Sequence, residues 1–185
     1  MITALLLGQA LFLVGYPAFI VLGAWLLDGW LDLPRFVHGA LNAVLALPLV
    51  VTGLILVEWT IALQFSQGLG TPLPIVATQR LITSGPYRYS RNPMAAGTTM
   101  VYLGVAVGLG SLAAGALASI YPLVITVYTK LVEEKELERR FGSRYVEYKR
   151  NTPFLFPHFA RRNSITVQVS CDGGPSDFTT PSNGP

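Results

Sequence analysis

The sequence predicts an all-α integral membrane protein: a bundle of about four transmembrane helices followed by a cytoplasmic helical extension at the C-terminus. Of the 185 residues, 51% are hydrophobic and only 12% are charged, whereas soluble domains carry roughly 25% charged residues. Three long segments hold almost no charge: Ile2–Leu27 and Asn92–Thr129 have none, and Val37–Phe65 has only Glu58. A membrane-spanning helix needs about 20 apolar residues, so each segment is long enough to cross a bilayer.

The first two segments predict an N-terminal pair of transmembrane helices, residues 1–65. Ile2–Leu27 is longer than the apolar core of a signal peptide and lacks a basic start, so we expect a permanent span. Asp28–Arg35 reads DGWLDLPR. Its aspartates, tryptophan and proline are typical of a turn at a membrane interface. The second span is expected over Val37–Phe65.

The third segment, Asn92–Thr129, predicts a helical hairpin. Its 38 residues exceed one span of about 20 but suffice for two short ones. The glycines of Gly108–Ser111 permit a tight turn between them. Asn92 is a good N-cap, and Pro93 fits the first helical turn, where a backbone N–H is not needed.

A charged helix is predicted to continue the fourth span beyond the membrane. One face of this helix carries apolar and aromatic side chains at spacings of four, four and three residues, namely Leu137, Phe141, Tyr145 and Tyr148. We interpret this face as packing. Opposite charges four residues apart, Lys130–Glu134 and Glu136–Arg140, support the exposed side. Gly142 interrupts the pattern and predicts a bend.

The distribution of basic residues predicts the orientation. Of 13 Lys and Arg residues, only Arg35 lies between the first two spans, and the other twelve fall between spans two and three or after span four. The positive-inside rule therefore places both termini in the cytoplasm. The net charge of +3 follows from this topology and does not indicate nucleic-acid binding.

The composition also argues against other chemistries. Cys171 is the single cysteine, so neither a disulfide framework nor a cysteine metal site is expected. The two histidines, His38 and His158, have no metal-ligand neighbours in the sequence, and we expect no metal. Residues 161–185 are rich in Ser, Thr, Gly and Pro, without a helical period, and are predicted to be a disordered tail.

Two polar segments are expected to meet at the cytoplasmic membrane surface. One is the loop before span three, with Arg88, Arg91 and Tyr87, and the other begins at Glu133 and Glu134 after span four. Such a cluster suits a polar ligand, while the neighbouring helices suit an apolar one. Irregular backbone at membrane depth is tolerated where it lines a cavity.

These segments carry a family resemblance. QRLITSGPYRYSRNPMAAG (Gln79–Gly97), followed by EEKELERRFGSRYVEYKRNTPFLFP (Glu133–Pro157), resembles the isoprenylcysteine carboxyl methyltransferase and phospholipid methyltransferase superfamily, in its bacterial form. The resemblance implies a membrane enzyme that transfers a methyl group from S-adenosyl-L-methionine to a lipophilic or small apolar acceptor. It implies a methyltransferase core over residues 66–160 with the cofactor on the cytoplasmic side.

The resemblance also implies the site residues. Cofactor-binding positions fall on Gln79, Leu81, Ile82, Tyr87, Asn92, Pro93, Met94, Glu133 and Glu134. A glutamate suits the cofactor's amino group or its ribose hydroxyls, because hydrogen bonds to a charged group are stronger than neutral ones. Apolar and aromatic side chains suit adenine. Arg88 and Arg91 are candidates for the reaction centre.

This chain departs from the family pattern at two positions. Many members carry Arg-His-Pro where this chain has Arg91-Asn92-Pro93, and asparagine has no proton-accepting nitrogen at neutral pH. The eukaryotic prenylcysteine enzymes place an arginine, which meets the substrate carboxylate, where this chain has Thr129. Asn92 removes any base role of that histidine, and the missing arginine argues against a prenylcysteine carboxylate as the acceptor.

Glu58 is a further catalytic candidate. It lies within the second span, where an ionisable side chain costs several kcal/mol unless it faces a cavity or a partner. Snorkelling, or a hydrogen bond to a neighbouring helix, explains it equally well. Two other functions stay open at this point: a non-enzymatic membrane scaffold or lipid-binding protein, and an NADPH-dependent lipid reductase.

Overall fold

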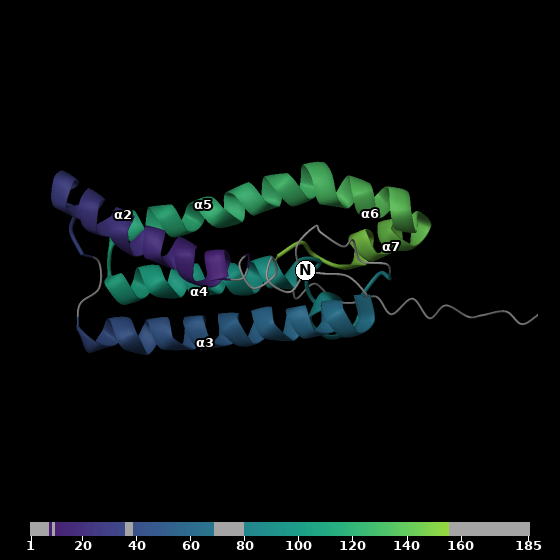
Figure 1. The fold of residues 1–185 in the computed structure, drawn as a ribbon, viewed down its shortest axis with the longest axis horizontal. Helices are drawn as coiled ribbons and strands as arrows, with labels where there is room; N and C mark the ends of the chain where they lie inside the picture. Colours follow the sequence, from purple (N-terminus) through teal and green to yellow (C-terminus); the bar gives the residue numbers. More distant parts are fainter. Residues whose placement is uncertain (1–7, 9, 36–38, 69–79, 156–185) are drawn as a thin grey trace, which may run out of the picture.

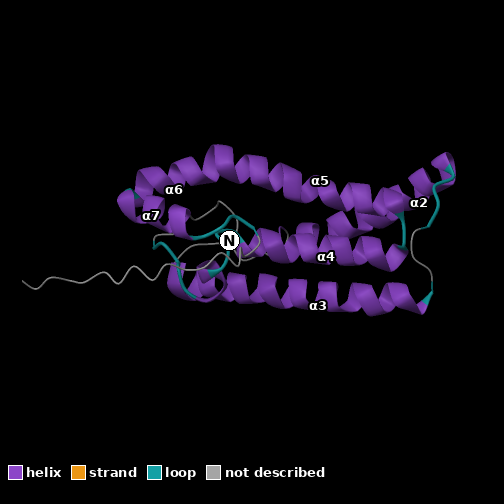
Figure 2. Ribbon diagram, turned by 180° about the vertical axis from the view of Figure 1, so that it is seen from behind, coloured by secondary structure: helices purple, strands orange, loops and turns teal. Residues whose placement is uncertain are grey.

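The computed structural model describes residues 8, 10–35, 39–68 and 80–155, and within them the fold is all-helical (Figure 2). A π-helical turn, Leu11–Gly15, leads into α2 (Tyr16–Leu31). The remaining elements follow in order: α3 (Ala40–Leu63) with a π turn at Gln64–Gly68, a 3₁₀ turn at Gly85–Arg88, α4 (Pro93–Leu109), α5 (Leu112–Tyr128) with a π turn at Thr129–Glu133, α6 (Glu134–Phe141) and α7 (Ser143–Asn151). The predicted all-α class is confirmed.

Within the described part of the chain, three continuous helices are long and apolar enough to cross a membrane: Leu11–Leu31, Ala40–Gly68 and Leu112–Phe141. The fourth, α4, has 17 residues. At 1.5 Å per residue it is about 25 Å long, slightly less than the roughly 30 Å of the hydrocarbon core. Large apolar side chains such as Trp25, Leu47 and Leu123 cover the outer faces of these helices, as expected for contact with lipid. The chain is a membrane protein.

The first predicted span ends later than expected, whereas the turn between spans three and four lies where it was predicted. Helix α2 continues to Leu31, so the first half of the predicted interfacial turn is helical. The chain reverses at Asp32, which adopts φ 48° and bonds its backbone N–H to the Asp28 carbonyl. The turn predicted between spans three and four is confirmed, since Gly110 has φ 61° and the Ser111 hydroxyl caps α5.

Helices α3 and α4 pack as an antiparallel pair (Figure 1) through glycines. A Cβ added at Gly53 would lie 2.6 Å from the Gly97 carbonyl oxygen, and a Cβ at Gly97 would lie 2.8 Å from the Gly53 carbonyl oxygen. Farther along, a Cβ at Gly104 would lie 2.6 Å from Val50. Small residues allow helix backbones to approach closely in membranes, where packing rather than hydrophobic burial holds helices together.

An aromatic cluster closes the centre of the bundle between α2, α4 and α5. The Tyr102 side chain is fully buried and donates to the Phe12 carbonyl at 2.6 Å. Tyr16 donates to the Leu117 carbonyl at 3.0 Å. The Tyr102 ring centroid lies 4.6 Å from Tyr16 and 4.9 Å from Tyr121. These contacts tie the start of α2 to the middle of the bundle.

The helical extension folds back at the end of the bundle where α3 ends and α4 begins (Figure 1). The π turn at Thr129–Glu133 joins α5 to α6, and Gly142, with φ 56°, reverses the chain into α7. The predicted extension and its bend at Gly142 are therefore confirmed. Its cytoplasmic location stays a prediction.

Candidate active site

A cavity of about 530 Å³ lies at this end of the bundle. Its inner wall is largely apolar and includes Phe12, Val57, Ile61 and Ile125. Its outer wall is polar and aromatic and includes Arg80, Tyr87, Arg91, Asn92, Thr129, Glu133, Glu134, Glu136, Arg140, Tyr145 and Tyr148. One continuous space therefore joins the interior of the bundle to a charged cluster at its end.

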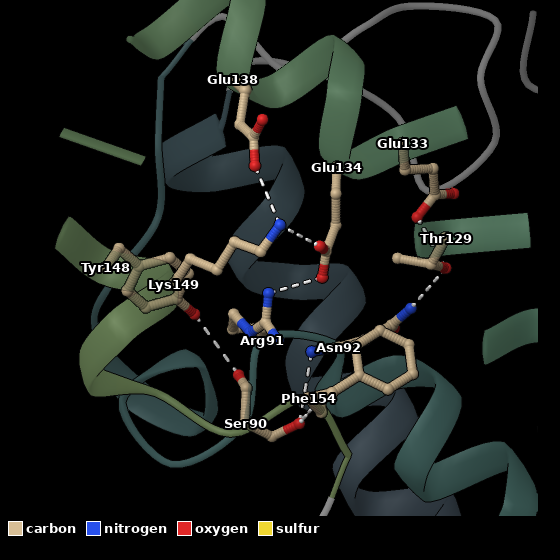
Figure 3. A network of polar contacts seen from close by, with 10 residues as sticks. All are labelled: Ser90, Arg91, Asn92, Thr129, Glu133, Glu134, Glu138, Tyr148, Lys149 and Phe154. Carbon is tan, nitrogen blue, oxygen red and sulfur yellow. Dashed lines mark hydrogen bonds and ion pairs between the residues drawn. The ribbon is translucent and has the colours of Figure 1, made fainter. Parts of the chain in front are cut away.

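The start of α4 connects the two polar segments. Asn92 caps the helix, as predicted, because its Oδ1 accepts from the Ala95 N–H at 3.0 Å. Its Nδ2 lies 3.4 Å from Thr129 Oγ1, and that hydroxyl donates to Glu133 Oε2 at 3.0 Å (Figure 3). Thr129 is buried. A chain of hydrogen bonds thus runs from the loop to the Glu133 carboxylate.

The segment after α7 holds the same loop from its other side. The backbone N–H groups of Arg91 and Asn92 donate to the carbonyls of Pro153 and Phe154 at 2.9 and 3.0 Å. The Ser90 hydroxyl also donates to the Phe154 carbonyl, at 2.9 Å. The Phe154 ring lies 5.8 Å from the Arg91 guanidinium, within the range of a cation–π contact. Loop and segment therefore act as one unit.

A network of ion pairs adjoins this unit, buried at Arg91 and Glu134 and partly exposed at Lys149 and Glu138 (Figure 3). Arg91 Nη1 contacts Glu134 Oε1 at 2.5 Å, and Lys149 Nζ contacts Glu134 Oε2 at 2.6 Å. Lys149 also contacts Glu138 Oε1 at 2.9 Å. Both carboxylate oxygens of Glu134 are therefore paired with cations. The expected pairing of Glu134 with Lys130 is wrong, whereas the Glu136–Arg140 pair forms at 3.6 Å.

Tyr87 lies between the loop and α3. Its phenol oxygen accepts from Gln64 Nε2 at 2.7 Å, and its backbone carbonyl accepts from the Tyr148 hydroxyl at 2.6 Å. Burial raises the pKa of Tyr87 from 10.0 to about 12. Tyr87 therefore keeps its proton near neutral pH and can donate it in a hydrogen bond.

The structure brings most of the predicted site residues to one cavity. The cavity is lined by eight of them: Leu81, Ile82, Tyr87, Arg91, Asn92, Met94, Glu133 and Glu134. Pro93 is buried at the first position of α4, beside the lining.

Three predicted residues lie elsewhere or outside the described part. Arg88 is exposed and lines a shallow surface depression with Arg144 and Glu147. Glu58 is exposed on α3 and is not among the residues that line the cavity. Gln79 lies outside the described residues, as does the predicted disordered tail.

Several lining residues were not among the predicted site residues. Gln64, Thr98 and Tyr121 line the cavity, as does Phe154. The face Leu137, Phe141, Tyr145 and Tyr148, interpreted from the sequence as packing, lines the cavity over its whole length. The prediction that one helix carries this face is wrong: Gly142 reverses the chain, so Leu137 and Phe141 lie on α6 and Tyr145 and Tyr148 on α7, and both helices face the cavity. Nothing in the sequence marked the others.

Comparison with family models supplies the identity. The phospholipid methyltransferase model matches residues 41–144. This match covers more than half of the chain. The chain belongs to the phospholipid methyltransferase family. It is therefore a membrane methyltransferase, as its resemblance to that superfamily implied. Comparisons with curated proteins and with solved structures gave no significant match. The match to the family model covers α3 to α6 and ends at Arg144, before most of α7 and the Phe154 segment.

Proposed function

We propose that this methyltransferase uses S-adenosyl-L-methionine and acts on a lipophilic or small apolar acceptor. The observation that carries the proposal is the cavity that joins an apolar interior to a polar end. Its volume of about 530 Å³ falls in the range of roughly 300–1,000 Å³ that suits one drug-sized ligand. A cofactor at the polar end leaves the apolar wall to the acceptor.

The residues present fit this cofactor. Glu133 is the carboxylate best placed for its amino group, because Glu133 lines the cavity and takes part in no salt bridge within the described residues. Hydrogen bonds between a carboxylate and a cationic group are stronger than neutral ones. Leu81, Ile82 and Met94 supply apolar surface for adenine. Tyr87 adds an aromatic ring and a hydroxyl.

The other polar residues have positioning roles in this proposal. Asn92 orients Thr129, and Thr129 orients Glu133 through the hydrogen bonds described above. Both oxygens of Glu134 are occupied, so we assign it the role of holding Arg91 in the cavity wall. Alignment of the reacting groups is the main demand on such a site, and a network of fixed side chains provides it.

S-adenosyl-L-methionine supplies a methyl group on a positively charged sulfur, and that charge disappears on transfer. A cavity that excludes water favours loss of charge. Here the apolar inner wall, with Val57 and Ile61, excludes water from below, and α6 and α7 cover the polar end. The chain's contribution is thus to bind, orient and desolvate.

The test is the thermal stability of the detergent-purified protein with S-adenosylhomocysteine. A ligand at about 100 times its dissociation constant stabilises by roughly 2.7 kcal/mol, which shifts the melting temperature measurably. We expect the shift to vanish in Glu133→Ala and to persist in the matched control Glu147→Ala, whose side chain lies outside the cavity lining. A shift with NADPH alone would instead support the reductase. No shift with either ligand would support a scaffold.

A further inference from the structure

Gln64 ends an apolar stripe on the inner face of α3. Val57, Ile61 and Gln64 all line the cavity, and their spacings of four and three residues place them on one side of the helix. Gln64 also begins the π turn that follows α3, and π-helical turns occur frequently at functional sites. A ligand with an apolar body along Val57 and Ile61 therefore has its polar end beside Gln64.

The nitrogen and the oxygen of the Gln64 amide differ in their hydrogen bonding. Its Nε2 donates to the Tyr87 phenol oxygen at 2.7 Å. Its Oε1 is buried, and the described residues provide it with no hydrogen-bond partner. Buried polar atoms are almost always paired, so an orphaned one on a cavity-lining side chain needs an explanation. A ligand that carries an O–H or N–H group would pair it.

Hydrogen-bonding chemistry favours such a ligand over a carboxylate. An ionised carboxylate has no proton to donate, so beside Gln64 Oε1 it would place two acceptors against each other. The charges of the lining do not decide between the two: Arg91 and Arg140 are paired with Glu134 and Glu136, and Arg80 and Glu133 also line the cavity. The preference therefore depends on the hydrogen bond to Gln64.

We propose that Gln64 is a specificity-determining residue. Its Oε1 accepts a hydrogen bond from an O–H or N–H group at the reacting end of an apolar acceptor, so alcohols and amines are preferred over carboxylates. This proposal rests on the proposed function, since it assigns the polar end of the cavity to the cofactor and the α3 stripe to the acceptor.

The experiment measures binding of three small molecules with ten-carbon alkyl chains to the full-length protein in detergent, saturated with S-adenosylhomocysteine. The probes are 1-decanol, decylamine and decanoate at neutral pH. We expect the alcohol and the amine to bind about tenfold more tightly than decanoate, a ratio equivalent to one hydrogen bond to a buried group. Gln64→Leu should abolish that preference, and Gln64→Glu, which keeps an accepting oxygen, should retain it.

The matched control is Gln67→Leu. Gln67 belongs to the same π turn, but it accepts from the Ser84 hydroxyl at 2.6 Å and is not part of the cavity lining, so the preference should be unchanged. Equal binding of decanoate, an unchanged preference in Gln64→Leu, or no binding of any chain would overturn the proposal.

S-adenosylhomocysteine binding distinguishes the remaining outcomes. We expect Gln64→Leu to change its affinity by less than about twofold, because one hydrogen bond to the cofactor would change it by about tenfold. A tenfold loss would make Gln64 a cofactor residue, which overturns the specificity role and leaves the proposed function intact. No binding of S-adenosylhomocysteine to the wild type would overturn both proposals.

Discussion

Removal of Glu134 tests the structure of the polar cluster most directly. Its side chain is 5% exposed, and that of its partner Arg91 is 12% exposed. Glu134→Ala leaves the guanidinium buried without its counter-ion, which costs about 3–5 kcal/mol. Lys149 is 38% exposed, so its loss of the same partner adds less than about 1 kcal/mol. We expect a total near 4 kcal/mol, of the order reported for breaking a buried pair.

The assay is thermal unfolding in detergent, followed by tryptophan fluorescence. In a chain of this size, 1 kcal/mol corresponds to about 2–4 °C, so a loss near 4 kcal/mol in Glu134→Ala should lower the melting temperature by roughly 8–16 °C. Glu138→Ala is the matched control. Glu138 pairs with the same Lys149 but is 39% exposed, and its removal should cost less than about 1 kcal/mol.

A double variant tests whether Glu134→Ala is destabilising because it leaves the Arg91 guanidinium unpaired or because the contact itself is lost. Arg91→Met combined with Glu134→Leu removes both buried charges, and such replacements are often neutral or stabilising. We expect it to recover most of the stability that Glu134→Ala loses. If Glu134→Ala is no less stable than Glu138→Ala, or if the double variant is as unstable as Glu134→Ala, the buried network does not have the energetics argued here.

Two further predictions concern the loop and the helix pair. The raised pKa of Tyr87, about 12 against 10.0, means that the folded state holds a proton that the unfolded state releases. The stabilisation is therefore complete below about pH 10 and is lost as the pH rises from 10 to 12. Melting curves from pH 10 to pH 12 should show that the wild type loses up to about 3 kcal/mol more free energy of unfolding than Tyr87→Phe does. Equal losses would contradict the pKa shift. At the helix pair, Gly97→Ala places a Cβ 2.8 Å from the Gly53 carbonyl oxygen, and overpacking of this kind costs about 1–3 kcal/mol. Gly115→Ala, with nothing within 4 Å, should melt as the wild type does.

Features that depend on neighbouring residues were predictable from the sequence. The cap at Asn92, the turn near Gly110 and the bend at Gly142 all follow from local backbone preferences, and the structure shows all three. The apolar spans follow from composition alone. The meeting of the two polar segments was predicted from the topology, which places both at one membrane surface, and both line the cavity.

Features that depend on how a helix is rotated were not predictable. The sequence left Glu58 open between a position facing a cavity and snorkelling or a contact with a neighbouring helix, and the structure places it exposed on α3. The reason is the close contact of Gly53 with Gly97, which fixes the inner face of α3. Val57 and Ile61 follow Gly53 on that face, at four and eight residues, and Glu58 is out of phase with them.

Salt-bridge partners that are distant in sequence were equally unpredictable. The spacing of Lys130 and Glu134 indicated a pair within one helix, but Glu134 turns to Arg91, 43 residues away in sequence, and to Lys149. Lys130 instead lies 5.9 Å from the Phe154 ring. An exposed pair four residues apart contributes only a few tenths of a kcal/mol. A buried guanidinium without a carboxylate costs far more, so the tertiary contact prevails.

The packing of α3 against α4 borders the cavity. Glycines bring the two helices into backbone contact at Gly53, Gly97 and Gly104, and a Cβ at Gly97 would also lie 3.0 Å from Val57, which lines the cavity. At the site end, the three π turns of the described residues each contribute to the lining, through Phe12, Gln64 and Thr129–Glu133. A π turn widens the helix and re-aims its side chains. The glycine contacts fix the helices, and the π turns shape the wall of the cavity beside them. The proposed methyl transfer needs such a rigid wall, because alignment and exclusion of water both depend on it.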